Sequence, residues 1–244
     1  MDQPDAQKTA PAAAKAEATP PGTSPWVTGG LSFVAGFADA ASFVGADGIF
    51  CAHVTGNFVV LAADAALGAR TDEWLKLATF PLFVFAVLGA TQIGRRAGSA
   101  RALMLTSGAL LGVAAAVGAV TNQVAGLPKT AIVALLVLAM GVQNAMHRLY
   151  PRLGPMTTVM TGNVTGFLVD VLGAPSSPQA GKQRSGAFVL GGFALGCAAG
   201  AFGVVQLGFV ALALPALVTL MVRAQQQAKE TARRTADSQA KRDR

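Results

Sequence analysis

The chain has 244 residues, of which 52% are hydrophobic and only 13% are charged, and its mean hydropathy is +0.50. A soluble domain carries about 25% charged residues, so this composition excludes an ordinary soluble enzyme or binding domain and indicates a lipid environment. The formal net charge of +7 does not indicate a nucleic-acid partner, because seven of the nineteen Lys and Arg lie in the tail 223–244 and most others lie in short breaks between apolar runs.

Residues 1–25 come first and are rich in Ala, Pro, Lys and acidic side chains. They lack the apolar core of a signal peptide, so we expect a disordered polar tail rather than a cleaved leader. The first apolar segment after this tail then acts as its own insertion signal.

Apolar segments of membrane-spanning length follow, since a spanning helix needs about 20 mostly apolar residues. The last of them would be about 54 Å long as one helix, whereas the hydrocarbon core is about 30 Å thick. We therefore expect it to be two helices joined by a tight turn near Val205–Gly208, which makes eight segments in all. The predicted segments are Trp26–Val44, Ile49–Leu67, Leu75–Ile93, Ala102–Val120, Thr130–Met146, Met156–Leu172 and Ala187–Val222.

Two of these segments are more polar than the rest and resemble each other. The motif T-G-N at 55–57 recurs at 161–163, and an Asp follows the Thr by nine positions in both copies. Upstream, G-x-x-[D/N]-A occurs at 36–40 and again at 141–145. Two motifs at nearly one offset predict an internal duplication, with a first repeat at 26–121, a second at 129–222 and a basic cytoplasmic tail at 223–244.

The distribution of Lys and Arg bears on the topology. If the T-G-N segments are broken or re-entrant, each half crosses three times, the repeats are inverted, and only Arg70, Lys76 and Lys129 lie outside when both tails are cytoplasmic. If all eight segments span, the repeats are parallel and five cations lie outside. The positive-inside rule favours the first arrangement. The predicted fold is an all-α polytopic membrane protein of two tandem repeats, with about six spanning helices plus two polar T-G-N segments; eight spans are the alternative.

Polar residues inside apolar segments are the candidate lining of a substrate or ion path. Non-helical backbone is tolerated at membrane depth only where it is buried in protein or lines a water-filled cavity, and discontinuous helices form the binding sites of duplicated transporters. The alternative is that these side chains only hydrogen-bond neighbouring helices together. The candidates are Asp39, His53, Thr55, Asn57, Asp64, Gln143, Asn144, Thr161, Asn163 and Asp170.

No set of residues indicates catalysis, a metal or a cofactor, so we do not expect an enzyme. His53 and His147 are the only histidines, and no His, Cys and carboxylate set has the spacing of a zinc site. Cys51 and Cys197 each lie in an apolar segment and do not indicate a disulfide. His147 ends a helix, where we expect the cytoplasmic interface.

Glycines spaced by four residues predict close helix contacts, either within the monomer or across a homodimer. They are Gly108 and Gly112, and Gly192, Gly196 and Gly200. The polar tail at 223–244 is interpreted as a solvated segment that fixes orientation, or as a helix lying against anionic lipid.

The runs G-F-A-D-A-A-S-F-V, H-V-T-G-N-F-V-V-L, G-V-Q-N-A and V-M-T-G-N-V-T resemble the YoaK family of bacterial membrane proteins, over about Trp26 to Val222. This resemblance implies a multi-pass protein of the bacterial inner membrane, in a family sometimes described as permeases. The hypothesis from sequence is a small transporter or permease of an unknown solute or ion, with its path lined by the two T-G-N segments. The alternative is a non-transporting scaffold, sensor or accessory subunit.

Overall fold

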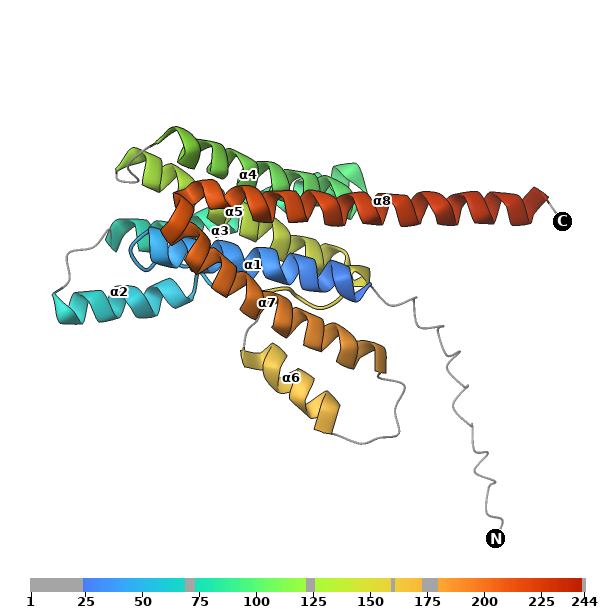
Figure 1. Ribbon diagram of the computed structural model, residues 1–244, viewed down its shortest axis with the longest axis horizontal. Coiled ribbons are helices and arrows are strands. Elements are labelled where there is room, and N and C mark those ends of the chain that lie inside the picture. The colour runs from blue at the N-terminus through green and yellow to red at the C-terminus, as the bar shows by residue number, and fades with distance from the viewer. Residues whose placement is uncertain (1–23, 69–72, 122–125, 159–160, 173–179, 243–244) are drawn as a thin grey trace, which may run out of the picture.

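The computed structural model describes residues 24–68, 73–121, 126–158, 161–172 and 180–242, and every regular element among them is helical. Eight α-helices and two short 3-10 helices, η1 and η2, make up this part of the chain (Figure 1). Their bounds are α1 Pro25–Gly45, α2 Gly56–Leu67, α3 Glu73–Ala97, α4 Ala100–Val120, α5 Leu127–Leu149, η1 Pro151–Leu153, α6 Thr161–Leu172, α7 Ala180–Leu207, η2 Gly208–Leu212 and α8 Ala213–Arg242.

Helix length separates the spanning elements from the rest. Five apolar helical runs are long enough to cross a bilayer, and the fifth, 186–229, contains 44 residues. This fifth run is divided by η2 into α7 and α8, and Gly208 at the division has a φ of 62°, which favours glycine. The predicted break near Val205–Gly208 is thus confirmed, and the described part of the chain is an all-α fold with five apolar runs of spanning length, consistent with a polytopic membrane protein.

The two T-G-N segments are broken, as expected. Helices α2 and α6 have 12 residues each, about 18 Å, which cannot cross a hydrocarbon core of about 30 Å. Each helix begins partway along the bundle and runs back to the end from which its preceding loop entered (Figure 1). Neither α2 nor α6 is long enough to span the bilayer by itself.

Corresponding helices of the two halves run in opposite directions. We call the end where α1 begins and α8 leaves the bundle the proximal end, and the opposite end the distal end (Figure 1). Helices α1, α4 and α7 run toward the distal end, and α3, α5 and α8 run toward the proximal end. The contacts correspond as well, because α1 packs on α7 as α5 packs on α3, and α8 packs on α1 as α4 packs on α5. An inverted duplication predicts this arrangement.

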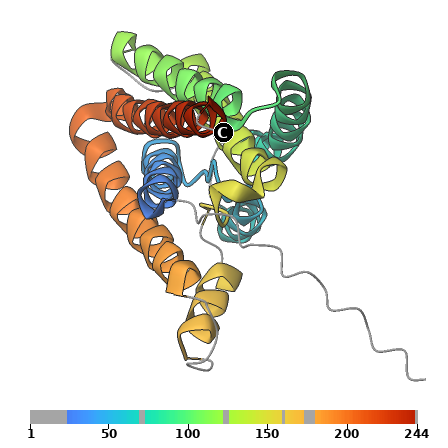
Figure 2. The same cartoon turned by 90° about the vertical axis from the view of Figure 1, so that its right-hand side faces the viewer.

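The helices that carry the G-x-x-[D/N]-A motifs lie inside the bundle. In α1 and α5, 72% of the residues of the most apolar stretch are buried, compared with 22% in α3. Viewed along the bundle, α1 is surrounded by α5, α7 and α8 (Figure 2). The polar residues of α1 and α5 therefore face protein rather than lipid.

The longest helix contact, between α1 and α7, is made by backbone against backbone. A Cβ atom at Gly192, Gly196 or Gly200 would overlap the carbonyl oxygens of Gly29, Phe33 and Phe37, respectively. Since both helices belong to one chain, this stripe serves packing within the monomer. A Cβ atom at Gly108 would contact Leu220 of α8, whereas nothing lies within 4 Å of one at Gly112.

Of the two interpretations of the tail, the helical one agrees with the observed secondary structure. Residues 223–242 continue α8 as a helix that projects past the proximal end of the bundle (Figure 1). Ala, Gln, Lys, Glu and Arg, which dominate this stretch, are good helix formers.

Candidate functional site

The first broken segment begins with a reversal of the chain at the distal end. Asp47 and Gly48 adopt φ values of 54° and 75°, in the left-handed region, directly after α1. The hydroxyl of Ser42 then donates to the carbonyl oxygen of Ile49 at 2.5 Å, which brings residues 49–55 back alongside α1. Two left-handed residues in succession let the chain turn into the bundle instead of leaving it.

Asp39 holds this returning segment in place. Its carboxylate is 3% exposed, and Oδ1 accepts hydrogen bonds from the backbone N–H groups of Cys51 at 2.9 Å and Ala52 at 2.8 Å. The other oxygen, Oδ2, lies 2.5 Å from Nδ1 of His53. Backbone amides freed by a break need acceptors where lipid excludes water. Asp39 is the acceptor for two such amides, those of Cys51 and Ala52.

His53 is the residue through which this carboxylate approaches solvent. Its side chain is 21% exposed, and its ring packs edge-on against Phe50 and against Phe193 of α7, with centroids 6.4 Å and 5.6 Å away. The carboxylate and imidazole form an ionisable pair at membrane depth. Among the described residues, no group of three His, Cys, Asp or Glu is arranged to hold a metal ion.

Asn57 of the first T-G-N motif also hydrogen-bonds the returning segment, through the backbone of Phe50. Its Oδ1 accepts from the N–H of Phe50 at 2.8 Å, and its Nδ2 donates to the carbonyl oxygen of Phe50 at 2.8 Å. Nδ2 also donates to Oγ1 of Thr79 on α3 at 2.9 Å. The side chain thereby replaces the backbone pairing that the break removes, while Thr55, just before α2, is exposed.

Replacing Asn57 by Ala should destabilise the folded protein by about 2–4 kcal/mol, because both backbone groups of Phe50 lose their partner. The matched control is Thr79→Val, which removes the bond from Asn57 to α3 and the local bond from Thr79 to the carbonyl oxygen of Lys76, and should cost about 1 kcal/mol. Denaturant unfolding of the purified protein in detergent measures both. Equal stability of the two variants would contradict the role assigned to Asn57.

An ion pair closes the distal end of α2. Lys76 of α3 is 1% exposed, and its Nζ lies 2.6 Å from Oδ2 of Asp64, whose side chain is 19% exposed. Sequence reasoning treated Lys76 only as a topology charge and missed this partner. A signal was present, because Asp64 and Lys76 recur as Asp170 and Lys182, both at an offset of 106.

The second broken segment repeats the construction with neutral groups. Asn144 occupies the position of Asp39 in the duplicated motif, and its Oδ1 accepts from Oγ1 of Thr158 at 2.8 Å. Gln143 donates through Nε2 to the carbonyl oxygen of Leu31 at 2.8 Å and to Oγ1 of Thr157 at 2.9 Å. The first segment is thus organised by a carboxylate and the second by amides and hydroxyl groups.

The structure groups the predicted site residues into two clusters, one around each broken segment. Thr161 begins α6 and is exposed. The side chains of Asn163 and Asp170 lie outside the part of the chain that the structure describes. His147, which sequence reasoning assigned only to an interface, belongs to the second cluster, because its Nε2 lies 3.2 Å from Oγ1 of Thr157.

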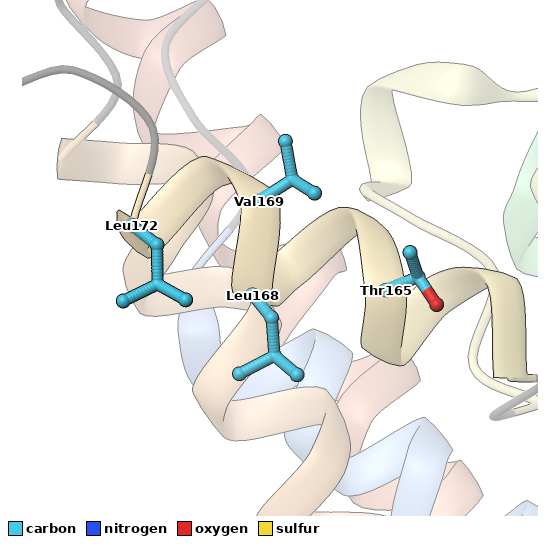
Figure 3. Close-up of a pocket in the computed structure, with 4 residues that line it drawn as sticks. All are labelled: Thr165, Leu168, Val169 and Leu172. Atoms are coloured by element: carbon cyan, nitrogen blue, oxygen red, sulfur yellow. The ribbon is translucent and has the colours of Figure 1, made fainter.

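A hollow of about 390 Å³ lies along α6, and none of its lining residues belongs to either cluster (Figure 3). Its lining comes from one helix and is almost wholly apolar, namely Thr165, Leu168, Val169 and Leu172. An open apolar groove of this kind is suited to contact with lipid or another helix and offers no polar groups to orient a solute.

Comparison with known protein families matches residues 27–224 to the family described as "Protein of unknown function (DUF1275)". No curated protein and no solved structure matches the chain. Because the match covers about four fifths of the sequence, the chain belongs to this family.

Proposed function

We propose that this DUF1275 protein is a small permease that moves a polar solute together with a proton. In this proposal Asp39 and His53 carry the proton, and the two broken segments line the path. The observation that carries the proposal is a carboxylate, 3% exposed, placed 2.5 Å from an imidazole on a broken membrane segment. Ionisable groups at membrane depth are costly and are characteristic of ion pathways and proton relays.

A proton suits Asp39 better than a larger cation does. The carboxylate already accepts three hydrogen bonds, two on Oδ1 and one on Oδ2, so a metal or ammonium ion that needs several ligands would find one free lone pair there. A proton can be added to the pair without displacing any of these groups. With the proton the pair is neutral overall, and without it the pair carries one negative charge. Because the pair holds residues 51–53, this change of charge would act directly on the broken segment.

The two inverted repeats are the units that would move against each other during transport. In transporters of this construction, discontinuous helices at a repeat interface form the site, and one repeat moves against the other. Here the first broken segment enters from the distal end and the second from the proximal end (Figure 1). We take the two segments as gates at opposite ends of one path.

We place the proximal end in the cytoplasm of a bacterial inner membrane. Arg95, Arg96 and Arg148 lie in the last turns of helices that end there. At the distal end Lys76 and Lys129 are each 2.6 Å from a carboxylate, of Asp64 and Asp47. This asymmetry follows the positive-inside rule. The bacterial inner membrane is the location that the resemblance to YoaK permeases implies, and reporter fusions after residue 242 test the orientation.

Proton uptake into proteoliposomes that contain a pH-sensitive dye tests the transport activity. We expect a solute gradient from a panel of polar compounds to drive uptake with the wild-type protein and at least about tenfold less with Asp39→Asn, which cannot carry the proton. The control is Asp47→Asn, an exposed carboxylate on the same segment that should leave uptake within about twofold. Equal uptake by the wild type and Asp39→Asn would refute the assignment of the proton site.

The second candidate is a non-transporting scaffold or accessory subunit, in monomeric or homodimeric form. The apolar hollow on α6 favours it, because such a groove can receive another helix. Thiol labelling distinguishes the two functions in a chain with Cys51 and Cys197 replaced. A membrane-impermeant reagent should label Thr55→Cys if the break faces water, with Val59→Cys, on the outer face of α2, as the control. Absence of labelling at position 55 would favour the scaffold.

A further inference from the structure

The second cluster contains two buried polar atoms that the protein leaves without a hydrogen-bond partner among its described residues. They are Oε1 of Gln143 and Nδ1 of His147, on side chains that are 2% and 4% exposed. These residues lie one turn apart on α5, and both bond to the hydroxyl of Thr157. The ring of His147 also approaches the backbone of Gly154, in the loop that opens at the proximal end.

The orientation of the Gln143 amide follows from its hydrogen bond to the backbone of Leu31. The carbonyl oxygen of Leu31 can only accept, so the group of Gln143 beside it must be the NH₂, and Oε1 is the free end of the amide. The second N–H of that NH₂ donates to Oγ1 of Thr157. Oγ1 of Thr157 can donate its own proton to Nε2 of His147, 3.2 Å away.

This relay determines the state of the histidine. Nε2 acts as an acceptor, so a neutral ring carries its proton on Nδ1. The cluster therefore presents one unused acceptor, Oε1 of Gln143, and one unused donor, the Nδ1–H of His147. Groups of this kind are rarely left unpaired inside a protein.

We propose that Gln143 and His147 form a binding site for the hydroxyl group of a small uncharged solute. A hydroxyl group can donate to Oε1 and accept from Nδ1–H at the same time, which neither a cation nor an anion can do. The surrounding groups of the cluster, from Ser32, Asn144 and Thr158, are also uncharged. The inference rests on the proposed function and names its substrate class: the first segment binds the proton, and the second binds the hydroxylic solute.

Nitrogen NMR of the full-length protein in bilayers tests the site without any transport measurement. The chain has only two histidines, so labelling both with ¹⁵N gives two rings to assign, and His53→Gln identifies the signals of His147. We expect His147 to carry its proton on Nδ1. Thr157→Val should remove this preference and produce both tautomers. Thr158→Val, which alters the neighbouring bond to Asn144, should leave the preference unchanged.

Two probes of similar size then test the ligand. Ethylene glycol both donates and accepts hydrogen bonds, whereas 1,2-dimethoxyethane only accepts. Ethylene glycol should shift the Nδ1 signal of His147 in a saturable way, whereas dimethoxyethane, which can accept from Nδ1–H but leaves Oε1 of Gln143 unpaired, should need about tenfold higher concentration. Gln143→Met should weaken the response to ethylene glycol about tenfold, because the acceptor is lost.

Each other result overturns the inference. A proton on Nε2 in the wild type refutes the direction of the relay. A correct tautomer with no response to ethylene glycol, or with equal responses to both probes, refutes a hydroxyl site; contact with water alone makes it a structural water site. Liposome swelling in ethylene glycol tests the proposed function separately. A saturable NMR response without swelling would retain the site and reject the permease.

Discussion

Replacing Asp39 by Ala is expected to lower the free energy of unfolding by about 3–5 kcal/mol, while Asp39→Asn should lower it by only about 1 kcal/mol. In the alanine variant the N–H groups of Cys51 and Ala52 lose their acceptor where water cannot replace it. In the asparagine variant Oδ1 still accepts from both amides, and Nδ2 can donate to Nδ1 of His53. Thermal or denaturant unfolding of the purified protein in detergent measures the difference.

The second half of the chain already has asparagine at the position equivalent to Asp39. Asn144 occupies the equivalent position in the second half and holds Thr158 through the same Oδ1 atom. The stability of Asp39→Asn therefore separates two roles, since the acceptor holds the segment and the negative charge serves the proton. The control for stability is again Asp47→Asn, because asparagine tolerates the left-handed φ of 54° at that position. If Asp39→Asn unfolds as readily as Asp39→Ala, the charge holds the segment and the roles are not separable.

The sequence predicted which segments break, because polar residues in an apolar run are costly unless the backbone there is irregular or faces protein. It did not predict what those residues bind. Asn57 pairs with backbone groups of Phe50, seven positions earlier, and no pattern of residue types marks a backbone partner. Asp64 was a candidate for the path, and its partner Lys76 becomes evident only when α3 folds back beside α2.

The second cluster shows a different limit of sequence analysis. Gln143 and Asn144 were identified because amides are unusual in a spanning helix, but the partner of Gln143, Leu31, comes from α1, more than one hundred positions away, as does Ser32, which donates to the carbonyl oxygen of Thr157. Residues so distant are brought together by the packing of the two halves, which an internal repeat predicts only in outline. The repeat does predict that a bond in one half has a counterpart in the other, and Asp39 and Asn144 follow that rule with different chemistry.

The glycine pattern predicted close helix contacts but not their location. Gly192, Gly196 and Gly200 could have faced a second copy of the chain, and the structure places them against α1. Local spacing cannot decide this, because one stripe suits both an internal and an intermolecular helix. The decision depends on which helix the fold brings alongside α7, and that is α1, from the other half.

Gly196→Ala is the substitution that tests this contact, and we expect it to destabilise the protein by about 2–3 kcal/mol. A methyl group at Gly196 would overlap the carbonyl oxygen of Phe33, and a backbone atom cannot move aside as a side chain can. Helices α1 and α7 would have to separate along their whole contact, which also shifts Phe193 against His53. The unfolding midpoint in detergent and, once a substrate is known, the rate of uptake measure the two consequences.

Gly191→Ala is the matched control for that substitution. The two glycines lie in the same helix, so alanine gives both the same gain in helix propensity, up to about 1 kcal/mol. Nothing lies within 4 Å of a Cβ atom at Gly191, so this variant should be as stable as the wild type or more stable. If Gly191→Ala stabilises the protein and Gly196→Ala destabilises it, backbone contact with α1 makes position 196 intolerant of alanine, and the low helix propensity of glycine does not. A stable Gly196→Ala protein would mean that α7 does not lie against α1 at this distance in the membrane.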